Sequence, residues 1–150
     1  MKVLAKDVRV ELHRVAYNCD LLLGIYHNSG RPALILVDAN PHSLGEPIGV
    51  ATTNAPLEYL LGTPLEFFSV KDWAENKGLW AQLSQLSDPN GFPLFSRATH
   101  RGVPLSLTLG FCCAEVWTLN HYAKELFHTL HAEMYSDAKF QAGALSIEES

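Results

Sequence analysis

Apolar and polar positions alternate through most of the first half of the chain. Val8, Val10 and Leu12 share one side of this alternation, and the positions between them are charged. A period of two residues is typical of strands with one buried face. The pattern predicts strands over residues 8–12, 21–27, 33–37, 48–53 and 65–70. A turn over residues 28–32 and a surface loop over residues 38–45 join the early strands, which favours an antiparallel meander.

The hydrophobic period becomes helical after residue 70. Asp72 is a typical N-cap residue, and Glu75 three positions later completes a capping box. We therefore predict a helix over residues 73–86, ended by the Asp-Pro-Asn-Gly sequence at 88–91. Its apolar face comprises Trp73, Leu79, Trp80, Leu83 and Leu86. Gly78 inside this helix costs roughly 1 kcal/mol relative to alanine.

The last third of the chain combines a strand with a second helix. A tight turn at residues 100–102 precedes a cleanly alternating strand over residues 105–111. From residue 119 to 135 an apolar stripe recurs at helical spacing, and it must pack against another element, most simply a face of the sheet. We predict one α+β domain over residues 1–137, a mainly antiparallel sheet of about five to seven strands packed by two helices. Residues 138–150 are predicted to be a flexible tail.

Composition excludes several classes of protein. The chain has 150 residues, 47% of them hydrophobic and 18% charged, with a net charge of −5. The acidic balance and the scattered basic residues argue against binding to duplex nucleic acid, and no apolar run is long enough to span a membrane. The N-terminus lacks the apolar stretch of an export signal, and three cysteines are too few for a disulfide framework. We expect a cytoplasmic protein with no cofactor.

Candidate catalytic residues are sparse, because the usual phosphate-binding, nucleophile and zinc motifs are absent from the sequence. His121, Glu125 and His128 lie on one face of the second predicted helix, opposite its apolar stripe. Two imidazoles and a carboxylate at this spacing either bind a metal ion or form an exposed polar face. Cys112 and Cys113 are interpreted as small buried hydrophobic residues, with a cysteine–histidine nucleophile as the alternative.

Two segments carry a resemblance to a known family. They are Gly-Glu-Pro-Ile-Gly-Val-Ala-Thr-Thr-Asn at 45–54 and Val-Lys-Asp-Trp-Ala-Glu-Asn-Lys-Gly-Leu at 70–79. Their order and separation resemble a family of small uncharacterised domains encoded on plasmids, integrative elements and phages, over about residues 20–118. The resemblance implies a mobile-element origin and a cytoplasmic location. It implies no catalytic residue, because the family brings no established activity.

The second of these segments also supplies a candidate binding site. Asp72, Glu75, Asn76 and Lys77 place polar groups at the start of the predicted helix 73–86, where a partner protein could dock. The alternative is that Asp72 and Glu75 only cap the helix and offset its dipole.

Three functions remain open from the sequence. The first is a non-enzymatic protein-binding module of mobile-element type, which binds a host or element-encoded protein and inhibits a host defence system. The second is a small metal-dependent or histidine-based enzyme that acts on a nucleotide or another small molecule through His121, Glu125 and His128. The third is a structural homo-oligomer, a homodimer formed through the helix over residues 119–135. Neither duplex nucleic acid nor a membrane is an expected partner.

Overall fold

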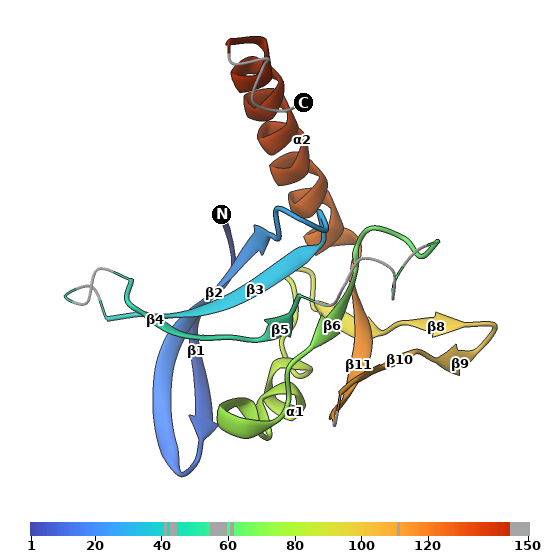
Figure 1. Ribbon diagram of the computed structural model, residues 1–150. Coiled ribbons are helices and arrows are strands. Elements are labelled where there is room, and N and C mark those ends of the chain that lie inside the picture. The colour runs from blue at the N-terminus through green and yellow to red at the C-terminus, as the bar shows by residue number, and fades with distance from the viewer. Residues whose placement is uncertain (41, 43–44, 55–59, 61, 111, 145–150) are drawn as a thin grey trace.

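The protein folds as a single α+β domain of mostly antiparallel strands and two helices, which confirms the predicted fold class (Figure 1). The computed structural model describes residues 1–40, 42, 45–54, 60, 62–110 and 112–144, and the side chains of those up to 136. In chain order the elements are β1 (Lys2–Leu12), β2 (Val15–Ile25), β3 (Pro32–Asp38), β4 (Pro47–Val50), β5 (Thr52–Thr53), β6 (Phe67–Val70), η2 (Ala74–Asn76), α1 (Leu79–Leu83), β7 (Phe95–Arg97), β8 (Thr99–His100), β9 (Val103–Pro104), β10 (Ser106–Leu109), β11 (Cys112–Leu119) and α2 (His121–Ala144).

The described strands form two main sheets that share one chain segment. One sheet has the order β1-β2-β3-β4, and the other has the order β10-β11-β6-β5, with β7 also paired to β11. The predicted strand over residues 48–53 is divided at Ala51, so that β4 pairs with β3 and β5 pairs with β6. The carbonyl of Ala51 accepts hydrogen bonds from the backbone of Lys71 and from the indole of Trp80. This residue therefore ties both sheets to α1.

The β1–β2 hairpin is longer than the sequence pattern predicts. His13 and Arg14 form its two-residue turn with φ angles of 51° and 68°, the left-handed conformation that hairpin turns of this length need. Near the middle of β1, Asp7 has a φ of 54° and the strand register shifts, while the Asp7 amide donates to the carboxylate of Asp20. Val8, Val10 and Leu12 are buried as predicted.

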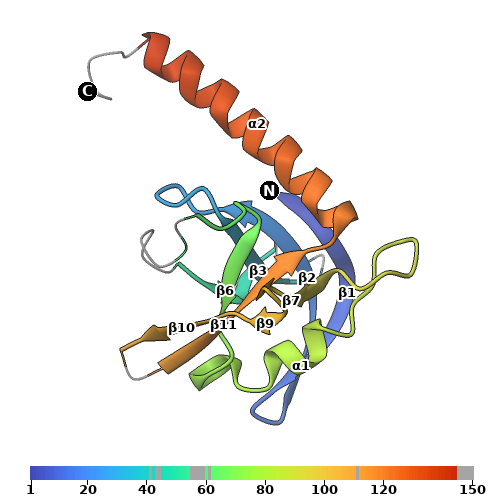
Figure 2. The ribbon, with the colours of Figure 1, turned by 90° about the vertical axis from the view of Figure 1, so that its right-hand side faces the viewer.

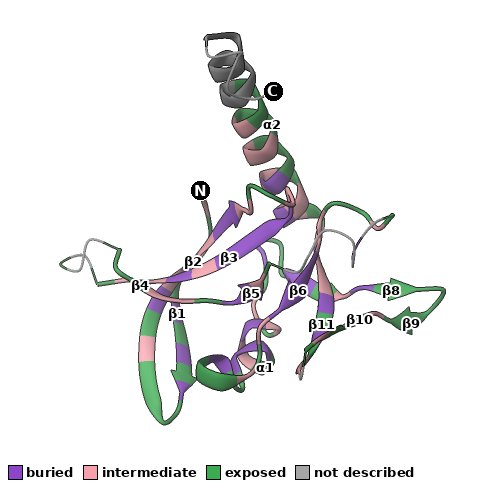
Figure 3. Ribbon diagram, viewed as in Figure 1, coloured by how far each residue is buried: buried purple, intermediate pink, exposed green. Residues whose placement is uncertain are grey.

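The main hydrophobic core lies between the two sheets and under both helices (Figure 3). β2 and β3 contribute Leu21, Leu23, Leu34 and Leu36, all at most 1% exposed. An aromatic cluster closes the core on the α1 side, and its rings lie with centroids 5.3 to 6.1 Å apart. It consists of Phe68, Trp80, Phe95 and Trp117. Burial of such large apolar side chains is the main force holding the sheets together.

The helix predicted over residues 73–86 is much shorter in the structure. A 3-10 turn, η2, covers Ala74–Asn76, and α1 covers only Leu79–Leu83. Gly78 separates them with a φ of 85°, a left-handed conformation that interrupts a right-handed helix. Glu75 makes no capping box and instead forms an ion pair with Lys71. Asp72 still serves α1, because its Oδ1 accepts a hydrogen bond of 2.9 Å from the backbone amide of Trp80.

We expect Asp72→Ala to lower the free energy of unfolding by about 1 kcal/mol, since an amide of the first turn of α1 loses its acceptor. Asp72→Asn is the matched control, because the asparagine side chain keeps an oxygen at the same place. Urea denaturation measures both. Equal stability of Asp72→Ala and the wild type would show that the capping bond contributes nothing.

The second helix begins at His121, two residues after the predicted start, because Leu119 still belongs to β11, and it extends further than predicted. Asn120 caps it, since its Oδ1 accepts a bond of 2.9 Å from the amide of Ala123, and its own Nδ2 donates to Asp88. α2 runs to Ala144, past the predicted end at residue 135, so residues 138–144 of the predicted tail are helical. Residues 145–150 lie outside the described part of the chain. In Figure 2 the C-terminal half of α2 projects beyond both sheets.

The strand predicted over residues 105–111 becomes β10, and Gly110, with a φ of 61°, begins the turn into β11. The predicted turn at residues 100–102 is confirmed as the β8–β9 hairpin, with positive φ angles at Arg101 and Gly102. The segment over residues 57–62, for which the sequence left helix and loop open, lies mostly outside the described residues.

Candidate functional site

Of the four residues predicted to meet a partner at a helix start, Asp72, Glu75 and Lys77 are exposed and Asn76 is buried. Asn76 is only 2% exposed, and its Nδ2 donates to the carbonyls of Val50 and Lys71. Asp72 holds the first turn of α1, as described above. Glu75 and Lys77 are exposed, and the ion pair with Lys71 lowers the pKa of Glu75. Asp72 and Asn76 therefore have structural roles.

The alternative metal site on α2 is not assembled among the described residues. His121 and Glu125 form an exposed ion pair with 3.1 Å between Nε2 and Oε1, and His128 lies exposed one turn further on. Within the described part of the chain, no three histidine, cysteine or acidic side chains come together as metal ligands. The residues instead form the polar face of the helix, which is the second interpretation offered by the sequence.

The three cysteines are free and differ in exposure. Cys19 is buried in the core and donates a hydrogen bond to the carbonyl of Val8. Burial, with a smaller contribution from Asp20 and Asp38, raises the pKa of Cys19 to about 11. Cys112 is half-buried and Cys113 is exposed, so the prediction that both are buried is wrong for Cys113.

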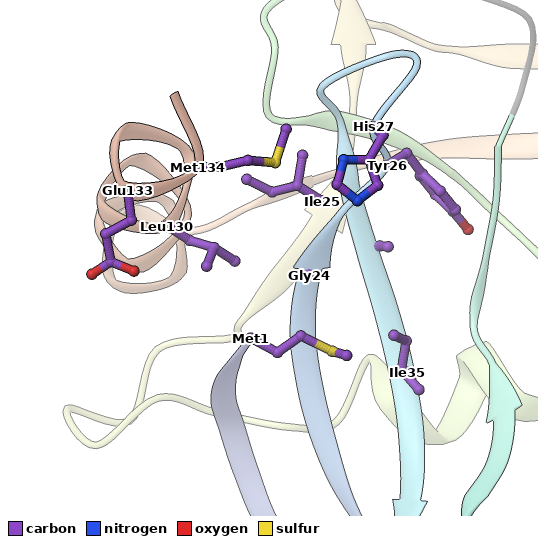
Figure 4. Close-up of a pocket in the computed structure, with 10 residues that line it drawn as sticks. Met1, Gly24, Ile25, Tyr26, His27, Ile35, Leu130, Glu133 and Met134 are labelled. Atoms are coloured by element: carbon purple, nitrogen blue, oxygen red, sulfur yellow. The ribbon is translucent and has the colours of Figure 1, made fainter. Parts of the chain in front are cut away.

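An apolar groove lies between α2 and the β2–β3 hairpin. It has a volume of about 710 Å³. Figure 4 shows Leu130 and Met134 on α2 forming one wall, with Met1 and Ile35 across from them. The remaining lining residues come from the ends of β2 and β3, from the turn after β2 and from α2: Gly24, Ile25, Tyr26, His27, Ala33 and Glu133. Polar lining groups are confined to a few positions, and apolar side chains predominate.

The wall formed by α2 is held in place by its first turns. Ala123 and Phe127 are fully buried in the main core, whereas Leu126 and Leu130 are only partly buried. Two ion pairs of 3.3 Å fasten the helix at its sides, Lys124 with Glu66 and Lys2 with Glu133. Exposed pairs of this kind contribute little stability, so the buried Phe127 is the main anchor.

His131 fixes the helix against the turn that follows β2. Its ring lies against Phe127 and Tyr135, with centroids 5.7 and 4.5 Å apart. Gly30 in the turn has a φ of 72°, and a Cβ added there would lie 3.5 Å from Nε2 of His131. Burial lowers the pKa of His131, and the neighbouring His128 lowers it further.

Sequence reasoning identified the α2 stripe but not the groove beside it. The groove combines the first residue of the chain with residues of β2, β3 and α2, which are far apart in sequence. The length of the apolar stripe on α2 could have indicated the groove. The earlier turns of the helix already cover the sheet, and Leu130 and Met134 extend the stripe beyond them.

None of the described helices combines the length and the apolar character needed to cross a membrane. Comparisons with protein-family profiles, with curated proteins and with solved structures found no match to this chain.

Proposed function

We propose that the protein is a non-enzymatic binding module whose partner protein inserts an amphipathic helix into the groove between α2 and the β2–β3 hairpin. The observation that carries this proposal is the apolar groove bordered by a helix that continues beyond the sheets to Ala144. An amphipathic helix commonly binds by laying its apolar face into a hydrophobic groove. Here a helix of the partner can pack along α2, as two helices pack against each other in proteins.

The side chains of the groove favour an apolar contact that can accept partners of different sequence. Met1 and Met134 lie in its walls, and methionine is a flexible and polarisable side chain that adapts to different partners. Leu130 is part of α2's apolar stripe and supplies a more rigid contact. A partner with apolar residues at positions i, i+3 or i+4, and i+7 would place them along this wall.

Charge favours a basic polar face on that partner. The chain has a net charge of −5, and Glu133 lies at the groove, where it forms an ion pair with Lys2. A lysine or arginine of the partner could share the Glu133 carboxylate at the rim. Such rim charges steer association more than they add affinity. The resemblance to mobile-element domains favours a bacterial host protein, such as a defence component, as the natural partner.

The proposal is tested by titrating the labelled protein with a synthetic leucine–lysine amphipathic helical peptide and recording NMR shifts. We expect the largest shifts at Ile25, Leu130 and Met134. Met134→Glu should weaken binding at least tenfold, since a charge enters an apolar contact that the peptide would cover. Thr129→Glu adds the same charge at an exposed position of the same helix and should leave binding near the wild-type level. Shifts centred on another surface, or equal effects of the two variants, would contradict the proposal.

A further inference from the structure

We propose that the free edge of β10 pairs with the same edge of a second copy, forming an antiparallel dimer about a two-fold axis at Leu107. β10 pairs with β11 on one side, and no described strand pairs with its other side. This edge lies away from the α2 groove (Figures 1 and 2), so the inference is independent of the proposed function.

The strand register determines which backbone groups point outward at this edge. The carbonyl of Leu105 accepts from the amide of Val116 on β11, so the backbone of Leu105 faces β11. Because successive residues of a strand direct their backbone groups to opposite sides, those of Ser106 and Thr108 face away from β11. These two residues present the donors and acceptors that an added strand requires.

Two of the other outer strands, β1 and β4, each receive a side-chain amide at one residue. On β1, Gln82 pairs with both backbone groups of Glu11, accepting from its amide at 2.7 Å and donating to its carbonyl at 2.8 Å. On β4, Asn76 donates to the carbonyl of Val50 at 2.6 Å. No described side chain bonds to the outward backbone groups of Ser106 and Thr108, and no lysine, arginine or acidic residue occurs between residues 102 and 114. Arg97 donates to the carbonyl of Leu105, which faces β11, and to the hydroxyl of Ser106. The strand therefore carries no charged side chain of its own to oppose edge pairing, although it is short and Pro104 precedes it.

The sequence of β10 is complementary to itself in one antiparallel register. With the two-fold axis at Leu107, Leu105 faces Leu109 of the second copy, and Leu107 faces its own equivalent. Ser106 then faces Thr108 of the second copy, and their outward backbone groups form hydrogen-bonded pairs. Leu105 and Leu107 are half-buried and pack against the small core of Leu60, Ala98 and Val116. The dimer would extend that core across the interface.

The contact is small, so we expect a reversible dimer whose population rises with concentration. Light scattering should show a mass that increases from monomer towards dimer on concentration. Amide exchange at Ser106 and Thr108 should slow over the same range. Thr108→Pro removes only an outward amide and should remain monomeric, whereas Thr108→Val keeps the amide and should dimerise. A mass that stays monomeric for the wild type at millimolar concentration would overturn the inference.

A cross-linking experiment tests the register and does not depend on the stability of the proline variant. In a Cys112→Ser, Cys113→Ser background, Leu107→Cys should form a disulfide-linked dimer under mild oxidation, because facing residues of this type lie about 4.5 Å apart at Cα. Ser106→Cys should not, since its partner position is Thr108. Equal cross-linking of both variants, or of neither, would contradict the proposed axis.

Discussion

Replacing Phe127 with alanine is expected to lower the free energy of unfolding by about 4 kcal/mol, the range for a buried phenylalanine. Phe127 is fully buried, and it joins α2 to the core formed by the two sheets. Its loss leaves a cavity under the helix that the neighbouring Ala123 is too small to fill. Urea denaturation would measure this loss directly, provided that the slope of the unfolding free energy against urea concentration is the same for the variant and the wild type.

The same substitution should also disturb the groove, since Leu130 lies one turn beyond Phe127 on the same side of α2. Amide exchange along α2 should therefore rise more than exchange in β2 and β3. Thr129→Ala is the matched control, because Thr129 is exposed and its replacement should change stability by less than about 0.5 kcal/mol. Equal stability of the two variants would show that α2 is not anchored by Phe127.

Arg31→Ala is the second substitution with a large expected effect, a loss of about 3 kcal/mol in the free energy of unfolding. Arg31 is only 7% exposed, and its guanidinium holds the segment before β6. Nη1 donates to the carbonyls of Pro64 and Phe67 at 2.9 and 3.0 Å. Nη2 donates to the carbonyl of Leu60 at 2.7 Å and to Oγ1 of Thr63 at 3.1 Å. Alanine would remove these four hydrogen bonds, although the carbonyls of Leu60 and Pro64 keep the donors they have within the segment.

Arg31→Lys distinguishes the geometry of the guanidinium from its charge. A lysine ammonium keeps the charge but lacks the planar fork, so we expect it to recover only part of the stability. Burial lowers the pKa of Arg31, yet a guanidinium remains charged in proteins, which is why arginine suits this site. Full recovery by lysine would show that charge alone holds the segment, and a loss below about 1 kcal/mol for alanine would contradict the structural role.

The sequence pattern predicted those elements in which the spacing of apolar residues matches the side that is buried in the folded protein. The strand over residues 33–37 appears as β3, with Leu34 and Leu36 buried and Ile35 and Val37 partly buried, and α2 begins directly after the cap at Asn120, within two residues of its predicted start. Asp72 was predicted as the N-cap of a helix beginning at residue 73, which was wrong, although its carboxylate accepts a hydrogen bond from the amide of Trp80 in α1.

Two of the failures, the start of β2 and the length of the first helix, share a physical cause, which is backbone in the left-handed conformation. His13 and Arg14 form a hairpin turn without glycine or asparagine, so the start of β2 was missed. Ala74 and Gly78 both have positive φ angles, and they break the periodic stretch that resembled one long helix. The groove escaped prediction for a different reason, because tertiary structure alone brings Met1 beside α2.

The central claim is that this protein acts by holding a partner's amphipathic helix in the groove beside α2. Its most direct test is to place a photo-crosslinking amino acid at Met134 or at Thr129 in bacteria and to map the cross-linked residues of the captured protein. We predict cross-links from position 134 but not from 129, to apolar residues three, four or seven positions apart on one helix. Equal cross-linking from both positions, or cross-links to a partner only from residues 72–77, would contradict the claim.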